Sequence, residues 1–119
     1  MDLEEIRQYC LQKKGTSEDF PFGEDTLVFR VKEKIFCLVN LEKIPTFVNL
    51  KCDPEKAVEL RGEYSSVKPG YHMNKRHWNS VYLEGGFSDR ELKEWIDHSY
   101  SLVARGLKKS ERIELGIEK

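Results

Sequence analysis

Residues 26–40, TLVFRVKEKIFCLVN, contain the two extended apolar segments that decide the fold class. Both segments, 26–31 and 34–40, are rich in β-branched and aromatic side chains, and the polar pair Lys32-Glu33 separates them. Two such segments joined by two residues are typical of an antiparallel β-hairpin. The pair contains no glycine, so the sequence leaves the type of turn open.

Three further strands are expected after this hairpin. Residues 47–52 place apolar side chains at every second position, which is the period of a strand with one buried face. Residues 71–74 and 78–83 contain large aromatic side chains and are joined by the polar pair Lys75-Arg76. We expect this pair to form the tip of a second hairpin, which would project from the sheet like a wing.

Two helices are expected around these strands. The first spans residues 2–13, where apolar side chains recur at the three-and-four spacing of one helical face. The second runs from Asp53-Pro54 to about residue 64, because Asp53 offers an N-cap oxygen and a proline at the first helical position loses no hydrogen bond. Residues 15–25 combine glycine, proline and short polar side chains, and they predict a loop.

A third helix has the most complete start signal in the chain. Ser88 and Glu91 are spaced as a capping box, and apolar side chains follow on one face. Gly106 suits the left-handed conformation that ends many helices. Residues 107–119 are rich in charge and weakly periodic, so we expect a mobile tail unless a partner holds it.

The predicted order of elements is therefore α-β-β-β-α-β-β-α. Sequential strands joined by short turns favour an antiparallel sheet, and amphipathic helices need a common apolar surface to cover. We expect a two-layer α+β domain over residues 1–106, with the helices on one face of the sheet and the other face at least partly open to solvent. A chain of 119 residues leaves no room for a second core.

Composition limits the partners and the compartment. Twenty basic and 21 acidic residues give a net charge of −1, so any site for a polyanion must be a local patch. Three cysteines without a CxxC pair favour reduced thiols, and the acidic N-terminus and the absence of a long apolar run argue against export and membrane anchoring. We expect a cytoplasmic protein that does not bind membranes.

The densest unusual stretch is residues 65–83, which hold three basic side chains, two histidines, three large aromatic side chains and no acidic residue. Lysine and arginine can neutralise phosphates, and exposed aromatic rings can stack on bases. The alternative interpretation is structural: the aromatic residues would pack against the sheet, and the cations would be ordinary turn charges that keep the protein soluble.

Five short motifs carry a resemblance to a known family. They are DFPFG at 19–23, KIF at 34–36, KCDP at 51–54, PGYHMNKRHWN at 69–79 and DHSY at 97–100. Together, over residues 3–104, they resemble the MmcQ/YjbR family of small bacterial proteins. The resemblance implies a secretion-chaperone-like α+β fold with this order of elements, and DNA binding through a double-wing arrangement.

Our leading hypothesis is weak and largely sequence-independent DNA binding by a local patch of basic and aromatic residues. The predicted DNA-binding residues are Lys51, Lys68, Tyr71, His72, Lys75, Arg76, His77 and Trp78. Lysine and arginine would contact phosphates, while the aromatic side chains would stack or fill a groove.

The alternative hypothesis is a module that binds a protein or peptide, or a second copy of itself as a homodimer, through the open face of the sheet. Its apolar contacts would come from Phe29 and Phe47 and from the tail residues Ile113, Leu115 and Ile117.

Neither catalysis nor a cofactor is indicated by the sequence. No thiol or hydroxyl has the spacing of a nucleophile with a histidine and an orienting carboxylate, so we assign no catalytic residue. His72 and His77 are five residues apart and would point to opposite faces of a strand, so we assign no metal site. Residues 97–100 are expected to attach the last helix to the sheet by hydrogen bonds; the alternative is that they border a surface site formed with Lys51 and His72.

Overall fold

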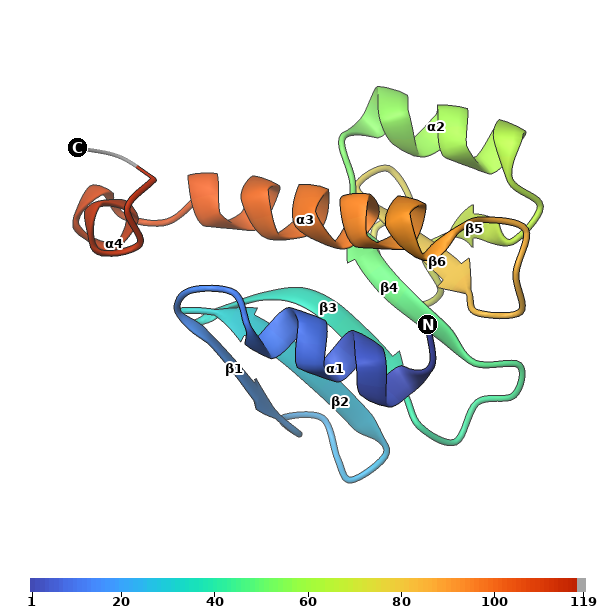
Figure 1. Cartoon of the computed structure of the whole chain (residues 1–119), viewed down its shortest axis with the longest axis horizontal. Helices are drawn as coiled ribbons and strands as arrows, with labels where there is room; N and C mark the ends of the chain where they lie inside the picture. Colours follow the sequence, from blue (N-terminus) through green and yellow to red (C-terminus); the bar gives the residue numbers. More distant parts are fainter. Residues whose placement is uncertain (118–119) are drawn as a thin grey trace.

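The computed structural model describes residues 1–117, which form a six-stranded antiparallel sheet and four helices (Figure 1). The strands lie in the order β1-β2-β3-β4-β6-β5. Their bounds are β1 Thr16–Asp19, β2 Thr26–Val31, β3 Lys34–Asn40, β4 Phe47–Lys51, β5 Val67–Pro69 and β6 Trp78–Tyr82. The helices are α1 Leu3–Leu11, α2 Pro54–Glu63, α3 Asp89–Arg105 and α4 Lys109–Glu114. The predicted α+β class is confirmed.

The hairpin predicted from residues 26–40 is confirmed as β2 and β3, with Val31 paired to Lys34. Lys32 takes a φ of 55° at the first position of the two-residue turn, a conformation that the favoured hairpin turns require. The sequence did not predict the type of this turn, because glycine usually supplies that conformation and the turn contains none.

One face of the sheet carries the core. Apolar side chains of α1, α2 and α3 meet the inward-facing side chains of the strands in a single buried cluster. The largest fully buried members are Phe29, Phe36, Ile6, Leu92 and Ile96. The start of α3 is confirmed, because the Ser88 hydroxyl accepts the Glu91 N–H and the Glu91 carboxylate accepts the Ser88 N–H.

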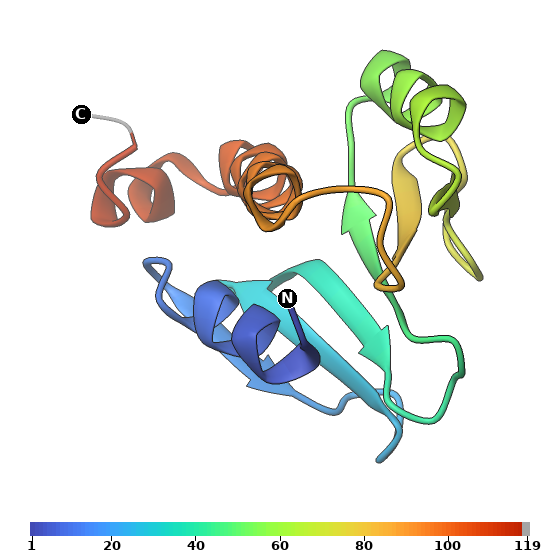
Figure 2. The same cartoon turned by 45° about the vertical axis from the view of Figure 1, so that its right-hand side comes forward.

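The sheet bends between β3 and β4. Figure 2 shows β1–β3 and β4–β6–β5 set at an angle, with α3 lying within it. Pairing of β3 with β4 is limited to Cys37–Leu50, Leu38–Asn49 and Val39–Val48. Beyond that segment the two strands separate, and a side chain of α3 enters the gap.

Ser99 of α3 completes the hydrogen bonding at this bend. Its buried hydroxyl donates to the carbonyl of Phe36 in β3 and accepts the backbone N–H of Lys51 in β4 at 2.8 Å. Its neighbours in the chain also bind backbone groups: His98 Nε2 accepts the Asp53 N–H, and the Tyr100 hydroxyl donates to the Lys14 carbonyl. The predicted attachment of the last helix to the sheet is confirmed for Ser99, whereas Asp97, His98 and Tyr100 bond to segments outside the strands.

Two predictions about the strands are wrong. Residues 16–19, expected to lie in a loop, form β1, which pairs with β2 at the edge of the sheet. Residues 71–74, expected to be a strand, form a turn in which His72 has a φ of 56°; the strand that pairs with β6 is β5 at residues 67–69. β1 consists of polar residues and β5 contains a proline, so neither shows the alternating apolar pattern from which strands were predicted.

The C-terminal segment is packed against the domain rather than mobile. Leu107 and Leu115, on either side of α4, are only 3% and 5% exposed and belong to the core cluster. The predicted mobile tail is therefore wrong for residues 107–117, and residues 118–119 lie outside the described part of the chain. Gly106 ends α3 with a φ of −85°, so its predicted left-handed conformation is also wrong.

Within residues 1–117, no helix combines the length and apolar character needed to cross a membrane.

Candidate functional site

The outward face of β4, β6 and β5 lies opposite the helices. Because Val48, Leu50 and Val81 point into the core, the alternate positions of these strands point outward. The outward residues are Phe47, Asn49, Lys51, Trp78, Ser80, Tyr82 and Lys68. They include two lysines and several aromatic rings, and no carboxylate is among them.

The loop of residues 70–77 crosses this face and is fixed by two buried polar side chains. The Ser80 hydroxyl accepts the Tyr71 N–H at 2.9 Å and donates to Asn49 Oδ1. Asn49 Nδ2 in turn donates to the Tyr71 carbonyl at 3.2 Å. The backbone of Tyr71 is thus held on both sides, although it belongs to no strand.

The second half of the loop is tied to α2. Asn74 Oδ1 accepts the N–H groups of Arg76 at 3.0 Å and His77 at 3.3 Å, which closes a tight turn. The Arg61 guanidinium of α2 donates to the Lys75 carbonyl and, at 2.7 Å, to Asn79 Oδ1. The predicted projecting hairpin tip at Lys75-Arg76 is therefore wrong, because the turn is held against the body of the protein.

The eight predicted site residues divide by exposure. Lys68, Tyr71, His72, Lys75 and Arg76 are exposed, while Lys51, His77 and Trp78 are half-buried. Lys51 pairs with Trp78 across β4 and β6. Within residues 1–117, none of the four lysine and arginine side chains forms an ion pair.

Two of the exposed cations are less free than the sequence predicted. The Lys75 ammonium donates to the Gly70 carbonyl at 2.9 Å, within its own loop. Arg76 borders a shallow surface depression together with Glu55 and Glu59 of α2, and these carboxylates offset its charge. Lys68 and Lys51 therefore remain as the more suitable phosphate ligands.

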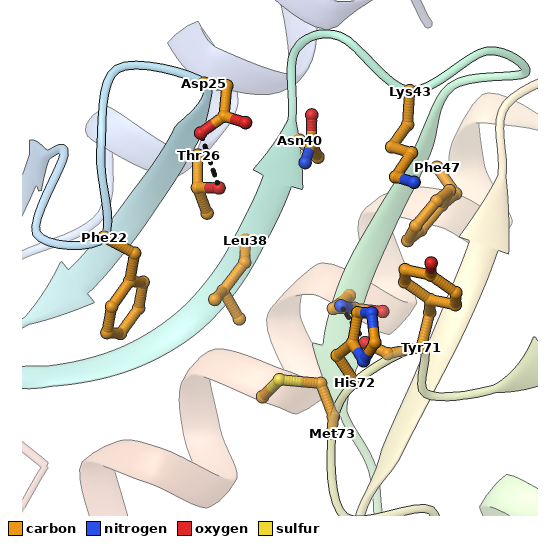
Figure 3. A pocket seen from close by; sticks show the side chains of 11 residues that line it. Phe22, Asp25, Thr26, Leu38, Asn40, Lys43, Phe47, Tyr71, His72 and Met73 are labelled. Carbon is orange, nitrogen blue, oxygen red and sulfur yellow. Dashed lines mark hydrogen bonds between the residues drawn. The ribbon is translucent and has the colours of Figure 1, made fainter.

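A cavity of about 530 Å³ adjoins this face where the loop 70–77 faces the loop before β2 (Figure 3). The lining residues are Phe22, Asp25, Thr26, Leu38, Asn40, Lys43, Phe47, Asn49, Tyr71, His72 and Met73. Among these residues, the sequence predicted Tyr71 and His72 as DNA-binding residues and Phe47 as an apolar contact of the alternative hypothesis. The DFPFG motif at 19–23, which contains Phe22, and the motif at 69–79, which contains Met73, were the available signals for further lining residues.

Aromatic rings form one wall of the cavity. The Phe47 ring meets Tyr71 edge-on at 5.7 Å between centroids, and the Tyr71 and His72 rings are 4.1 Å apart. The Lys43 ammonium lies 5.3 Å from the centroid of the Tyr71 ring, in a cation–π contact. The arrangement offers flat apolar surface beside a positive charge.

The cysteines offer no activated nucleophile. All three are free and buried, as expected for reduced thiols. Burial raises the pKa of the Cys52 thiol to about 11, and the hydrogen bond with Cys10, together with burial, raises the pKa of the Cys37 thiol. Both thiols are therefore protonated at neutral pH.

Comparison with known proteins identifies the family. The family model YjbR matches residues 11–102. The chain belongs to the YjbR family. Uncharacterized protein YbdF of Escherichia coli O157:H7 is 43% identical over 93 residues, covering 78% of this chain and 76% of that protein. Uncharacterized protein YjbR of Escherichia coli K12 is 32% identical over 112 residues, covering 94% and 95%.

Solved structures of YjbR relatives share this fold. The crystal structure of Deinococcus radiodurans protein DR2400, a DUF419 domain, aligns with a TM-score of 0.89 at 38% identity, covering 98% of this chain and 91% of that one. A crystal structure from Pseudomonas syringae aligns with a TM-score of 0.75 at 30% identity, covering 86% and 98%. The predicted family resemblance is confirmed.

In this YjbR chain, His98 is expected to make stability depend on pH. Burial, with a smaller contribution from Lys56, holds the pKa of His98 below its ordinary value of 6.5, although Asp53 opposes the shift. The neutral ring is the form that accepts the Asp53 N–H. As the pH falls, His98 therefore becomes protonated in the unfolded chain before it does so in the folded protein. Its contribution to stability is fully present above pH 6.5 and is lost as the pH falls through the lowered pKa of the folded state.

We expect the melting temperature of the native protein to fall more than that of His98→Gln between about pH 8 and pH 5. Glutamine offers a neutral acceptor that does not titrate, while the carboxylates are common to both proteins. Thermal unfolding followed by circular dichroism measures the difference. Identical pH profiles would show that His98 does not couple to folding.

Proposed function

We propose that this YjbR-family domain binds DNA weakly and with little sequence preference on the outward face of β4, β6 and β5. The observation that supports the proposal is the composition of that face: its strand positions hold Lys51, Lys68 and aromatic rings, and no carboxylate. In a protein of net charge −1, such a segregated region is the kind of local patch that a polyanion requires.

Each group in the patch has a role suited to its exposure. Lys68 and Lys51 contact phosphates, which positions the DNA without reading its sequence, and Lys75 contributes less because its ammonium already donates to the Gly70 carbonyl. Tyr71 is 41% exposed and, with His72, offers ring surface to bases or sugars. Trp78 and His77 are half-buried and support the surface. Arg76 contributes less, because Glu55 and Glu59 lie beside it.

A salt titration with a short DNA duplex tests this proposal. With about three to five phosphate contacts, the logarithm of the binding constant is expected to fall against that of salt concentration with a slope of roughly −3 to −4. Lys68→Gln is expected to reduce the slope by about 1. Fluorescence anisotropy of a labelled duplex measures both quantities.

Lys109→Gln is the matched control, because Lys109 is an exposed lysine of α4 at the opposite end of the molecule from β5 (Figure 1). This variant is expected to keep the native slope. The proposal fails if no binding is detected at low salt, or if the two variants change the slope equally.

A second candidate, binding of a protein partner or a second copy, is favoured by exposed apolar side chains in the loops beside the cavity. Ile44 is 91% exposed and Phe22 64% exposed, with Phe20 and Leu41 nearby in sequence. The apolar residues predicted for this role are mostly unsuitable: Phe29, Phe47 and Leu115 are buried, whereas Ile113 and Ile117 are exposed. A mass that rises with concentration in light scattering would favour the dimeric form of this candidate.

A further inference from the structure

The cavity beside the proposed DNA surface has two facing walls. Phe22, which is 64% exposed, stands on one side, while Tyr71 and His72 stand on the other, with Leu38 of β3 between them (Figure 3). A flat ring entering from solvent would meet apolar or aromatic surface on both sides. The volume of the cavity, about 530 Å³, lies in the range of small-molecule sites.

One end of the cavity presents a hydrogen-bond acceptor beside a donor. Asn40 pairs with Thr26 across β2 and β3, which brings Asp25 close to Asn40, and the Leu41 N–H fixes the Asp25 carbonyl at 2.7 Å. Asp25 Oδ1 accepts the Thr26 hydroxyl, and Asn40 Oδ1 accepts the Glu42 N–H. Asp25 Oδ2 and Asn40 Nδ2 have no protein partner within residues 1–117. An acceptor beside a donor matches the polar edge of a nucleobase.

The cavity and the proposed DNA surface are continuous. Phe47, Asn49, Tyr71 and His72 belong to both. At the cavity, the exposed Lys43 places its ammonium 5.3 Å from the Tyr71 ring centroid, where it can also meet a phosphate. A strand lying on the lysines of β4 and β5 would therefore pass the mouth of the cavity.

From these features we infer that the cavity receives one unpaired base of single-stranded DNA, an inference that rests on the proposed function. Bases inside a duplex are stacked and paired, so they cannot enter between two facing walls without leaving the helix. A single strand presents its bases at much lower cost, and ring stacking tolerates any base. The phosphate contacts are common to both forms of DNA, whereas the cavity adds affinity only for the unpaired one.

The test compares a short abasic DNA strand with the same strand carrying one central adenine. The single base is expected to raise affinity about 5-fold to 100-fold, the usual effect of one base stacking on an aromatic side chain. Phe22→Ala is expected to abolish most of this gain, and its exposure means that the fold does not depend on it. Phe20→Ala is the matched control, because Phe20 is exposed in the same loop and does not line the cavity.

The outcomes separate this inference from the proposed function. If both strands and the duplex bind equally with the expected salt slope, the surface binds DNA but the inference is wrong. Loss of the gain in both phenylalanine variants would also overturn it. Free adenosine monophosphate binding as tightly as the one-base strand would assign the cavity to a nucleotide instead of a strand. No binding of any DNA would reject the proposed function itself.

Discussion

Replacing Ser99 by alanine is expected to lower the free energy of unfolding by about 2–4 kcal/mol, because the buried Phe36 carbonyl and the part-buried Lys51 N–H lose their partner. The Ser99 hydroxyl is fully buried and bridges the Phe36 carbonyl and the Lys51 N–H where β3 and β4 separate. Thermal unfolding should therefore begin about 10 °C lower.

Ser101→Ala is the matched control for this experiment. Ser101 lies on the same helix and is exposed, so its loss should change stability by less than about 0.5 kcal/mol. Equal melting temperatures for the two variants would contradict the bridging role of Ser99. The result bears on function as well, since the bend places β4 and its outward lysine relative to β3.

The elements of the fold that could be predicted from the sequence are those whose signals are local. The Ser88 and Glu91 capping box lies within four residues, and the hairpin of residues 26–40 needs only its own apolar pattern and a two-residue turn. The role of Ser99 was also accessible, because it lies on the apolar face of α3. The partners of Ser99 were not predictable in this way, because Phe36 and Lys51 lie 63 and 48 residues away in the sequence.

The candidate site was only partly predictable, because it depends on register between distant segments. Ser80 holds Tyr71 only because β6 pairs with β4 so that Ser80 lies opposite Asn49. Residues 71–74 contain side chains typical of a strand, yet these buried polar groups stabilise a turn there instead. The cavity joins the loop before β2 to this turn, and no spacing within the chain predicts that they face each other.

Gly70 decides how closely this loop approaches β6, so Gly70→Ala is expected to destabilise the protein by about 1–3 kcal/mol or more. A Cβ at this position would lie 2.8 Å from Trp78 Cβ and 2.9 Å from the Trp78 carbonyl oxygen. The Gly70 N–H donates to that same carbonyl at 2.9 Å, so the backbone cannot move away without losing the bond. Denaturant unfolding measures the loss, and DNA binding should weaken with it because Tyr71 and His72 follow directly in the loop.

Gly62→Ala is the matched control for this experiment, because the same substitution is expected to stabilise the protein at this position. Gly62 lies in α2, and apart from its two chain neighbours and the nearby backbone of the helix itself, no atom lies within 4 Å of the position its Cβ would occupy. Alanine leaves the unfolded chain fewer conformations than glycine does, so less entropy is lost when the helix forms. The free energy of unfolding of this variant is therefore expected to rise by about 0.5–1 kcal/mol. If Gly70→Ala were as stable as Gly62→Ala, the close contact between the loop and Trp78 would be wrong. The position of the proposed DNA-binding loop would then depend on its hydrogen bonds, among them those with Asn49, Ser80 and Arg61.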